Sequence, residues 1–452
     1  MKSKGLRSLA NQLADQSMTS RELCEKALDR SRNTQSVFIN LNEDILYLAD
    51  LIDQKRKSTA QVPALAGIPI ALKDLFDVRH QKTLAGSVVL KDQVNRAEQD
   101  AAVVAPLRNA GLLFLGRLNM SEFAFSGMGM NPHYGTPLSV WDRVTGHLPG
   151  GSSSGSGVVV GEGIVAAALG SDTAGSCRIP AAFNGIVGVK PSYGRLPLTG
   201  IFPLSHSSDA PGPLAVDVDS CHILDRFMMQ DPQAARLPEI AIIDPAKLTL
   251  IVPDADVMRG LDDTVQNTFE AGVTKLKMAG FNFQTHKMPS LDGCIEFFKT
   301  NPVAVYEAYQ LHRQNLENHF ASFDPFVGQR ILTGKDISPA EQQDRYEQKS
   351  WLIKQFNAEF SALGADAVLY PTVACIPPAI SDCKDSEQAR IINLNCLRNT
   401  ATVNNFDGCS ISLPCHKPGE APVGLMVSAR NGEDEKLYQV AAALESALRN
   451  ET

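Results

Sequence analysis

The chain has 452 residues, of which 44% are hydrophobic and 20% charged, the balance of an ordinary globular protein. Its formal net charge of −8 and its lack of a basic run argue against a nucleic-acid backbone as the principal partner. No stretch approaches about 20 apolar residues, so we expect no membrane span, and the N-terminal residues lack the apolar core of a signal peptide.

The cysteines and histidines predict neither a disulfide framework nor a metal site. The nine cysteines include no C-x-x-C pair, and the nine histidines include no H-x-x-x-H pair. An odd number of cysteines, in a chain long enough to build its own core, is typical of reduced thiols. We therefore expect a cytoplasmic protein that needs no metal and no cofactor.

The elements expected in the first part of the chain alternate between helix and strand. A T-x-x-E capping box at Thr19 predicts the start of one helix, and Asp100 is expected to cap another over 100–109. The apolar run Leu65–Leu72 has the length of a strand and ends at Lys73, and a second short strand is expected over 112–115. This alternation favours an α/β layer fold.

From about residue 237 longer helical patterns appear. Strands are expected over 248–252, 281–285, 367–370, 409–413 and 423–427, and helices over 261–278, 303–320, 339–363 and 434–448. No segment has the composition of a linker, so we expect one large α/β domain.

The stretch from Gly150 to Pro191 stands out by composition. Glycine and serine dominate its start, a run of small apolar residues fills its middle, and a second serine-containing turn follows. The apolar run distinguishes it from a flexible linker and predicts that it is buried. Because buried hydroxyl groups need partners, the serines indicate either a polar network or a reaction centre.

Two serine chemistries are compatible with this stretch. Gly151–Gly155 fits the G-x-S-x-G pattern of a nucleophile elbow, but the residues before it make a poor strand and no histidine has a pocket-like context. Lys73 is an alternative base, provided that burial lowers its pKa enough to keep the amine neutral. The local sequence alone favours a lysine that extends to the surface.

Five segments, in this order, resemble the amidase signature family. They are LAGIPIALKD (65–74), GRLNMSEFA (116–124), PGGSSSGSG (149–157), GSDTAGSCRIPAAFNGIVGVKPSYGR (170–195) and PVGLMV (422–427). The resemblance covers nearly the whole chain and is weakest from about 230 to 365. It implies an α/β fold in which a mixed central β-sheet is covered by helices on both faces.

The resemblance also implies a division of one amidase domain over residues 1–452. N-terminal helices are expected over 1–60, a catalytic core over 61–230, a variable and mostly helical insertion over 230–365, and a return to the core sheet with a final helix over 366–452.

A catalytic triad follows from the same resemblance. It makes Lys73 the base, Ser152 the bridging serine and Ser176 the nucleophile that forms the acyl-enzyme. Gly151 is expected to support the bridge through a cis peptide bond to Ser152. The backbone N–H groups of Thr173, Ala174, Gly175 and Ser176 are expected to form the oxyanion hole.

The neighbours of the triad have expected roles as well. Asp172 and Arg178 are more consistent with a buried pair that supports the nucleophile turn, although some family members bind a substrate carboxylate with the matching arginine. Ala124 and Phe125 match positions that line the substrate cleft of the family. Ser153, placed with them at the substrate site, is expected to support the hydroxyl network.

The expected activity is hydrolysis of the C–N bond of a small carboxamide to a carboxylate and ammonia. The segment DTAGS (172–176) resembles allophanate hydrolases, so a urea-derived acid stays open as the substrate. The glutamine-hydrolysing subunit of a tRNA-dependent amidotransferase would retain the same triad and is a further alternative. The expected partner is a small amide, without direct contact to nucleic acid or membrane, and a homodimer stays open.

Overall fold

The computed structural model describes residues 4–58, 61–231 and 237–449, so the boundary expected at residue 60 lies outside the described residues. The strands are β1 (Phe38–Leu41), β2 (Pro69–Lys73), β3 (Leu113–Leu118), β4 (Ala167–Asp172), β5 (Val187–Lys190), β6 (Ala210–Ala215), β7 (Leu250–Asp254), β8 (Phe283–Lys287), β9 (Ala367–Pro371), β10 (Cys409–Pro414) and β11 (Gly424–Ala429). The α-helices are α1 (Leu6–Ala14), α2 (Ser20–Arg32), α3 (Ile45–Lys57), α4 (Ala105–Asn109), α5 (Ser154–Gly161), α6 (Arg178–Asn184), α7 (Val218–Met228), α8 (Asp263–Met278), α9 (Pro289–Thr300), α10 (Val303–His319), α11 (Pro325–Leu332), α12 (Pro339–Ala362), α13 (Ser386–Leu397), α14 (Ala401–Asn405) and α15 (Asp434–Arg449).

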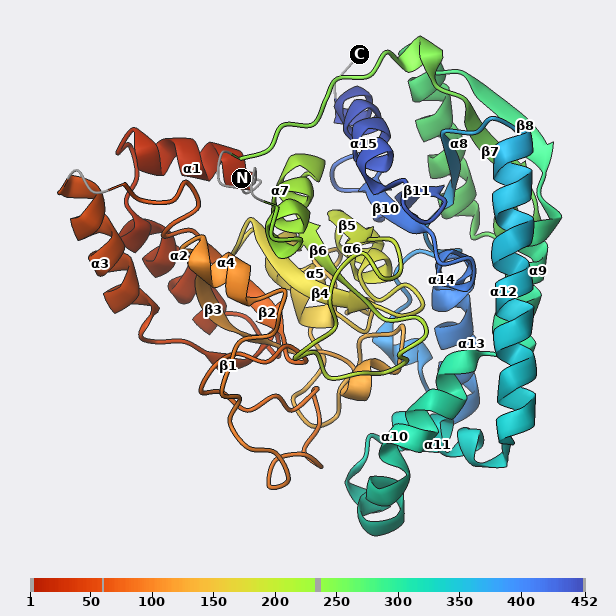
Figure 1. Cartoon of the computed structure of the whole chain (residues 1–452), viewed down its shortest axis with the longest axis horizontal. Helices are drawn as coiled ribbons and strands as arrows, with labels where there is room; N and C mark the ends of the chain where they lie inside the picture. The colour runs from red at the N-terminus through yellow and green to blue at the C-terminus, as the bar shows by residue number, and fades with distance from the viewer. Residues whose placement is uncertain (1–3, 59–60, 232–236, 450–452) are drawn as a thin grey trace.

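One sheet of 11 strands runs through the described part of the chain, in the order β1-β3-β2-β4-β6-β5-β10-β11-β9-β7-β8 (Figure 1). The neighbours β3, β2 and β4 are parallel, as are β9, β7 and β8, whereas the strands between these two groups are antiparallel. The expected mixed central sheet is therefore confirmed.

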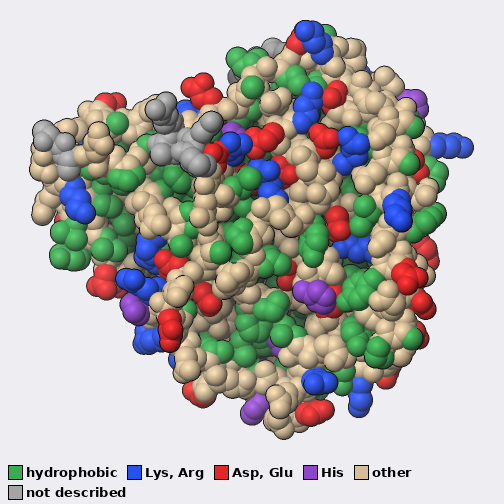
Figure 2. All heavy atoms as spheres, viewed as in Figure 1, with side chains coloured by type: hydrophobic (Ala, Val, Ile, Leu, Met, Phe, Trp, Pro, Cys, Tyr) green, Lys and Arg blue, Asp and Glu red, His purple; other side chains and the backbone are tan. Residues whose placement is uncertain are grey.

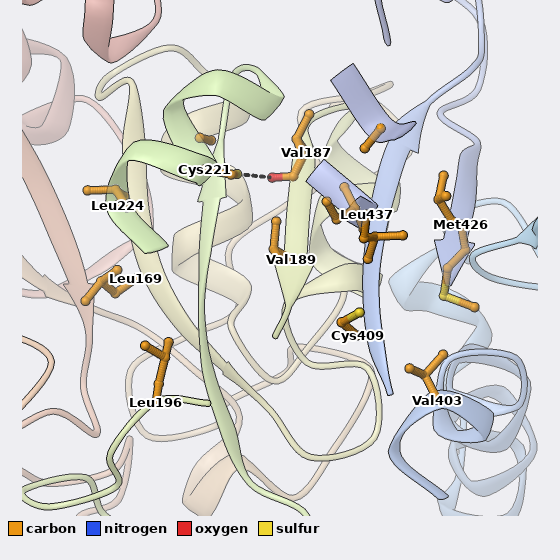
Figure 3. Packing of buried hydrophobic residues seen from close by; sticks show 14 of the residues in the cluster. Leu169, Val187, Val189, Leu196, Cys221, Leu224, Val403, Cys409, Met426 and Leu437 are labelled. Carbon is orange, nitrogen blue, oxygen red and sulfur yellow. Dashed lines mark hydrogen bonds between the residues drawn. The ribbon is translucent and has the colours of Figure 1, made fainter. Parts of the chain in front are cut away.

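Alternate side chains of β4 show why helices cover both faces of the sheet. Ala167 and Leu169 belong to the hydrophobic cluster that includes α7 and α15, whereas Ala168 belongs to a second cluster that includes α5. Successive side chains of a strand point to opposite faces, so β4 must be apolar on both. Figure 3 shows the first cluster, in which the Cys221 thiol of α7 points to the carbonyl oxygen of Val187 in β5. The expected helical layer on each face is confirmed.

The helix expected over 100–109 is shorter than its pattern indicated, and Asp100 does not cap it. The first residue of α4 is Ala105. The Asp100 carboxylate instead accepts the Arg79 N–H at 2.8 Å and pairs with the Arg108 side chain. These contacts outside the first helical turn remove Asp100 from the position where it would bind the free N–H groups of a helix.

The capping box at Thr19 was a better guide to the start of a helix. The Thr19 hydroxyl accepts the Glu22 N–H, and the Glu22 carboxylate accepts the Thr19 N–H, so α2 begins as expected. Ser338 and Glu341 make the same reciprocal pair at the start of α12. Each pair satisfies two backbone groups that the helix itself leaves without a partner.

Helix α12 is attached to the rest of the fold through aromatic packing. The rings of Phe356 in α12 and Phe406 after α14 are both fully buried and stack with centroids 3.7 Å apart and an angle of 6° between their planes. In Figure 1, α12 runs along the edge of the molecule beside α9. This stacked pair therefore joins the region of 230–365 to the core near β10.

The surface offers no large patch of one charge on the face shown in Figure 2, where acidic and basic side chains are interspersed with hydrophobic ones. Among the described helices, none combines the length with the hydropathy that a bilayer crossing requires.

Replacement of Phe356 by alanine is expected to lower the free energy of unfolding by about 3–5 kcal/mol, because it removes a buried ring and leaves a cavity against Phe406. The matched control is Trp351→Ala on the same helix, where the side chain is 57% exposed and the expected loss is below about 0.5 kcal/mol. Urea titration measures both variants. Equal losses in the two would show that the stacked pair does not anchor α12.

Candidate active site

Two neighbouring parallel strands bring the proposed base and the nucleophile segment together. Lys73 is the last residue of β2, and Asp172 is the last residue of β4. Leu72 and Leu169 lie opposite each other in the register of these strands, so Ser171 comes one residue beyond the level of Lys73 and its hydroxyl group reaches the Lys73 amine. The carboxyl ends of adjacent parallel strands are where α/β sheets place functional residues.

Lys73 is buried and bonded to serine hydroxyl groups. Its side chain is 0% exposed, and its Nζ donates to Ser152 Oγ at 2.7 Å and to Ser171 Oγ at 2.9 Å. The interpretation of Lys73 as a surface lysine is therefore wrong. Burial lowers the pKa of Lys73 to about 7, because the apolar surroundings disfavour the charged amine.

The segment before α5 places Ser152 against this amine. The peptide bond between Gly151 and Ser152 is cis, as the family resemblance implied. A Cβ atom at Gly151 would lie 2.4 Å from the Gly129 backbone nitrogen, so only glycine fits there. The Ser152 carbonyl accepts the Ser121 N–H at 3.1 Å, which fixes the backbone on the other side.

Ser153 links the strand end to the nucleophile turn. Its Oγ donates to the Ser171 carbonyl at 3.3 Å, and its N–H donates to the Ser176 carbonyl at 3.3 Å. Ser153 is fully buried and does not belong to the cavity wall described below. The geometry therefore gives Ser153 a place in the hydroxyl network and none in direct contact with a ligand in that cavity.

The turn that carries Ser176 is held by the Asp172 carboxylate. This carboxylate accepts the N–H groups of Gly175 at 2.8 Å and Cys177 at 3.1 Å, and it pairs with the Arg178 guanidinium at 2.9 Å. Burial alone would raise the pKa of Asp172, but the charge of Arg178 holds it at about 2. Asn404 of α14 contacts both members of the pair.

These contacts change two of the expected roles. The Gly175 N–H is committed to Asp172, so the N–H groups of Thr173, Ala174 and Ser176 are the candidates left for an oxyanion hole. Arg178 is fully buried and is not part of the cavity wall, so its guanidinium supports the turn.

A cavity with an empty volume of about 570 Å³, its mouth included, lies on the exposed side of the turn. Its wall includes Ser176 together with Thr173, Ala174 and the expected cleft residues Ala124 and Phe125. The remaining wall residues are mainly apolar: Ser126, Leu204, Ser208, Phe298, Pro302, Val303, Ala304, Val305, Arg330, Leu397, Ala401, Asn404 and Asn405. The region from about 230 to 365, where the resemblance to the family is weakest, thus contributes a large part of the cavity wall.

Sequence reasoning missed several members of the site. Ser171 precedes Asp172 in β4, and the pairing of β4 with β2 was the signal that could have placed it beside Lys73. Thr400, whose Oγ donates to the Ala174 carbonyl at 2.7 Å, and Asn404 come from a distant segment without a recognisable motif. Their contacts depend on the tertiary fold.

Two further features concern the chemistry that the site can support. The hydrogen bonds of the described residues join Lys73 to Ser152 but include none between the hydroxyl groups of Ser152 and Ser176. Within residues 4–58, 61–231 and 237–449, no three His, Cys, Asp or Glu side chains converge in a way that could hold a metal ion.

Comparison with known proteins identifies the family. A model of the Amidase family matches residues 20–438. The chain is 31% identical to 2-amino-5-chloromuconic acid deaminase of Comamonas testosteroni, over 85% of this chain and 82% of that protein. It is 43% identical to one subunit of the glutamyl-tRNA(Gln) amidotransferase of Chromohalobacter salexigens, over 99% of this chain and 97% of that protein.

The fold agrees with these similarities. A crystal structure of an amidase superposes with a TM-score of 0.87 and 29% sequence identity, and the match covers 98% of this chain and 99% of that one. The sheet order, the buried lysine and the family match lead to the same conclusion: the chain belongs to the amidase signature family and is an amidohydrolase.

Proposed function

We propose that the protein hydrolyses a small carboxamide to a carboxylate and ammonia, with Ser176 as nucleophile, Ser152 as bridge and Lys73 as base. The observation that carries this proposal is the buried Lys73 amine, which contacts the Ser152 hydroxyl behind a cavity whose wall contains Ser176. A serine hydroxyl is a weak nucleophile until a base removes its proton.

The relay needs a neutral lysine and a rotation of one hydroxyl group. With a pKa of about 7, a large fraction of Lys73 is neutral near neutral pH and can accept a proton from Ser152. Ser152 in turn takes the proton of Ser176 when the Ser176 Oγ turns toward it. The Ser176 oxygen then attacks the amide carbonyl carbon and forms a tetrahedral intermediate.

The nucleophile turn supplies the stabilisation of that intermediate. Thr173, Ala174 and Ser176 follow the end of β4 and belong to the wall of the cavity, so their N–H groups are the proposed donors. One well-placed backbone donor in such a site typically contributes about 3–4 kcal/mol to transition-state stabilisation. Asp172 holds the turn from behind, so these donors require little rearrangement during the reaction.

Collapse of the intermediate breaks the C–N bond. The relay returns the proton to the nitrogen, which leaves as ammonia, and Ser176 stays acylated. Water, deprotonated through the same relay, then attacks the acyl carbon and releases the carboxylate. The sum is one amide and one water converted to one carboxylic acid and one ammonia, with the triad restored.

A second candidate is hydrolysis of glutamine for a partner protein. It is supported by the 43% identity to one subunit of a glutamyl-tRNA(Gln) amidotransferase. Glutamine carries an α-ammonium group, which needs an anionic or strongly polar partner when it is buried. The wall of the cavity contains no acidic residue among those described, so simple amides are the better match.

Ser176→Ala is expected to lower kcat for ammonia release by at least about 1,000-fold, since it removes the attacking oxygen. The matched control is Ser154→Ala, because Ser154 is also buried near the bridge but its hydroxyl group donates, among the described residues, only to the Asn119 carbonyl. Ammonia release from simple amides measures both variants. Activity in Ser176→Ala comparable to that of the control would contradict the assignment of the nucleophile.

The pH dependence of kcat/KM is expected to follow deprotonation of Lys73. The base acts when neutral, so kcat/KM should fall about tenfold for each pH unit below 7 and level off above it. Lys73→Met should lose this dependence of kcat/KM on pH together with most of the activity.

Lys190→Met serves as the control for this profile. Burial lowers the pKa of Lys190 to about 8, but among the described residues its amine donates hydrogen bonds only to carbonyl oxygens, so the rise of kcat/KM near pH 7 should persist. Two results would contradict Lys73 as the base. One is a wild-type kcat/KM that rises only near pH 10, and the other is a rise near pH 7 that is lost in Lys190→Met but not in Lys73→Met.

A further inference from the structure

The peptide group between Ala174 and Gly175, in the middle of the nucleophile turn, is held at both ends. Its N–H, which belongs to Gly175, donates to the Asp172 carboxylate at 2.8 Å. Its carbonyl, which belongs to Ala174, accepts the Thr400 hydroxyl group at 2.7 Å. A trans peptide group is planar, and its N–H and C=O point in opposite directions. Asp172 and Thr400 therefore fix the orientation of this plane from opposite sides.

The Thr400 hydroxyl group is committed to the Ala174 carbonyl. Its oxygen lies 2.7 Å from the Ala174 oxygen and 3.1 Å from the Leu397 oxygen, three residues earlier in the chain. A hydroxyl group has one hydrogen, and two oxygen atoms this close repel each other unless a hydrogen lies between them. The hydrogen therefore points to Ala174, although Leu397 offers the local acceptor that threonine side chains often use.

Gly175 allows Thr400 to approach the turn. Its φ of +132° lies in the region that favours glycine, and a Cβ atom there would lie 2.1 Å from the Thr400 hydroxyl oxygen. The Thr400 side chain is fully buried and does not belong to the cavity wall, whereas Ala174 and Ser176 do. Thr400 thus holds the Ala174 carbonyl from behind the wall.

The helix that follows Thr400 holds the turn at a second point. Asn404 of α14 comes four residues after Thr400, a spacing that places two side chains on the same face of a helix. The Asn404 amide donates to the Asp172 carboxylate at 3.1 Å and accepts the Arg178 guanidinium at 2.7 Å. The start of α14 therefore orients the middle of the turn, and its end orients the ion pair that supports the turn.

The orientation of the 174–175 peptide group decides which partial charge faces the cavity. The proposed hydrolysis develops a negative charge on the substrate oxygen beside Ser176, which N–H groups stabilise and a carbonyl oxygen would repel. A hydrogen bond from Thr400 keeps the Ala174 carbonyl turned away from that charge. The N–H groups of Ala174 and Ser176 then remain the groups that the turn presents to the substrate.

We propose that Thr400 is a positioning residue for the oxyanion hole, because its hydroxyl group holds the Ala174 carbonyl out of the cavity. This inference rests on the proposed hydrolysis by Ser176. The hydrogen bonds of Thr400 among the described residues include none to Lys73 or Ser152. Loss of the hydroxyl group should therefore weaken the stabilisation of the tetrahedral intermediate and spare both the proton relay and the binding of an uncharged amide.

Three substitutions separate the hydroxyl group of Thr400 from the rest of its side chain. With butyramide and benzamide, Thr400→Ala should lower kcat for ammonia release about 10- to 100-fold and change KM by less than about threefold. Thr400→Ser restores the donor without the methyl group, and its kcat should return to within about fivefold of the wild-type value. Thr400→Val keeps the size without the donor and should behave like Thr400→Ala.

Thr402→Ala is the matched control. Thr402 is also fully buried in α14, but its hydroxyl group donates to the Asn399 carbonyl at 2.7 Å and contacts Tyr370 at 2.8 Å, with no printed bond to the turn needed for its packing. This variant should keep kcat within about threefold of the wild-type value. The melting temperature reports whether each variant is folded. The rise of kcat/KM near pH 7 should persist in Thr400→Ala, and its loss would mean that the relay, and not the oxyanion hole, depends on Thr400.

Boronic acids provide a readout that does not depend on turnover. The Ser176 oxygen adds to the trigonal boron of benzeneboronic acid and its proton passes to the relay, so the adduct is a tetrahedral anion that resembles the intermediate. Thr400→Ala should raise the inhibition constant about tenfold or more. Calorimetry with benzamide on the Ser176→Ala protein, with and without Thr400→Ala, should differ by less than about threefold. Equal weakening of boronate and amide would overturn the assignment, since it would indicate a general change in the shape of the cavity.

The two proposals fail in different ways. A kcat in Thr400→Ala and Thr400→Val within about threefold of wild type would overturn the role of Thr400 and leave the hydrolysis intact. A kcat in Thr400→Ser as low as that in Thr400→Ala would do the same, because the hydroxyl group would not be the cause. Ammonia release by Ser176→Ala equal to that of the wild type would instead overturn the proposed hydrolysis.

Discussion

The burial of one amine, that of Lys73, is the constraint on which the rest of the proposed site depends. An isolated ammonium ion is too costly to bury without a counter-ion, so the surroundings favour the neutral form. A neutral amine between the hydroxyl groups of Ser152 and Ser171 is the arrangement that a proton relay needs. The parallel pairing of β2 with β4 creates this burial, because it places Lys73 at the end of a strand covered on both faces.

Two arginines of the site differ in their partners. Arg178 is fully buried with Asp172 and thereby fixes the backbone that carries Ser176. Arg330 has no such partner among the described residues and lies in the wall of the cavity. The paired charge of Arg178 stabilises the nucleophile turn, whereas Arg330 is the one charged side chain among the described residues that line the cavity.

The sequence motifs predicted the proposed triad along the chain, because Lys73, Ser152 and Ser176 each follow a segment with a strong pattern. They could not show that Lys73 is buried, since its neighbours in sequence fit a surface lysine equally well. Asp100 has the sequence position of a helix cap, but its carboxylate binds the Arg79 N–H and the Arg108 side chain instead. Arg330 has no local signal at all, because what distinguishes it is the absence of a nearby acid among the described residues.

The most direct test of this account is a titration of the Lys73 amine itself. In protein labelled with 15N at the lysine side chains, the Nζ resonance of Lys73 is the one that Lys73→Met removes. The account predicts that this resonance titrates with a pKa of about 7. A pKa near the ordinary lysine value of about 10.4 would mean that the amine is protonated under working conditions, and it would contradict the proposed relay.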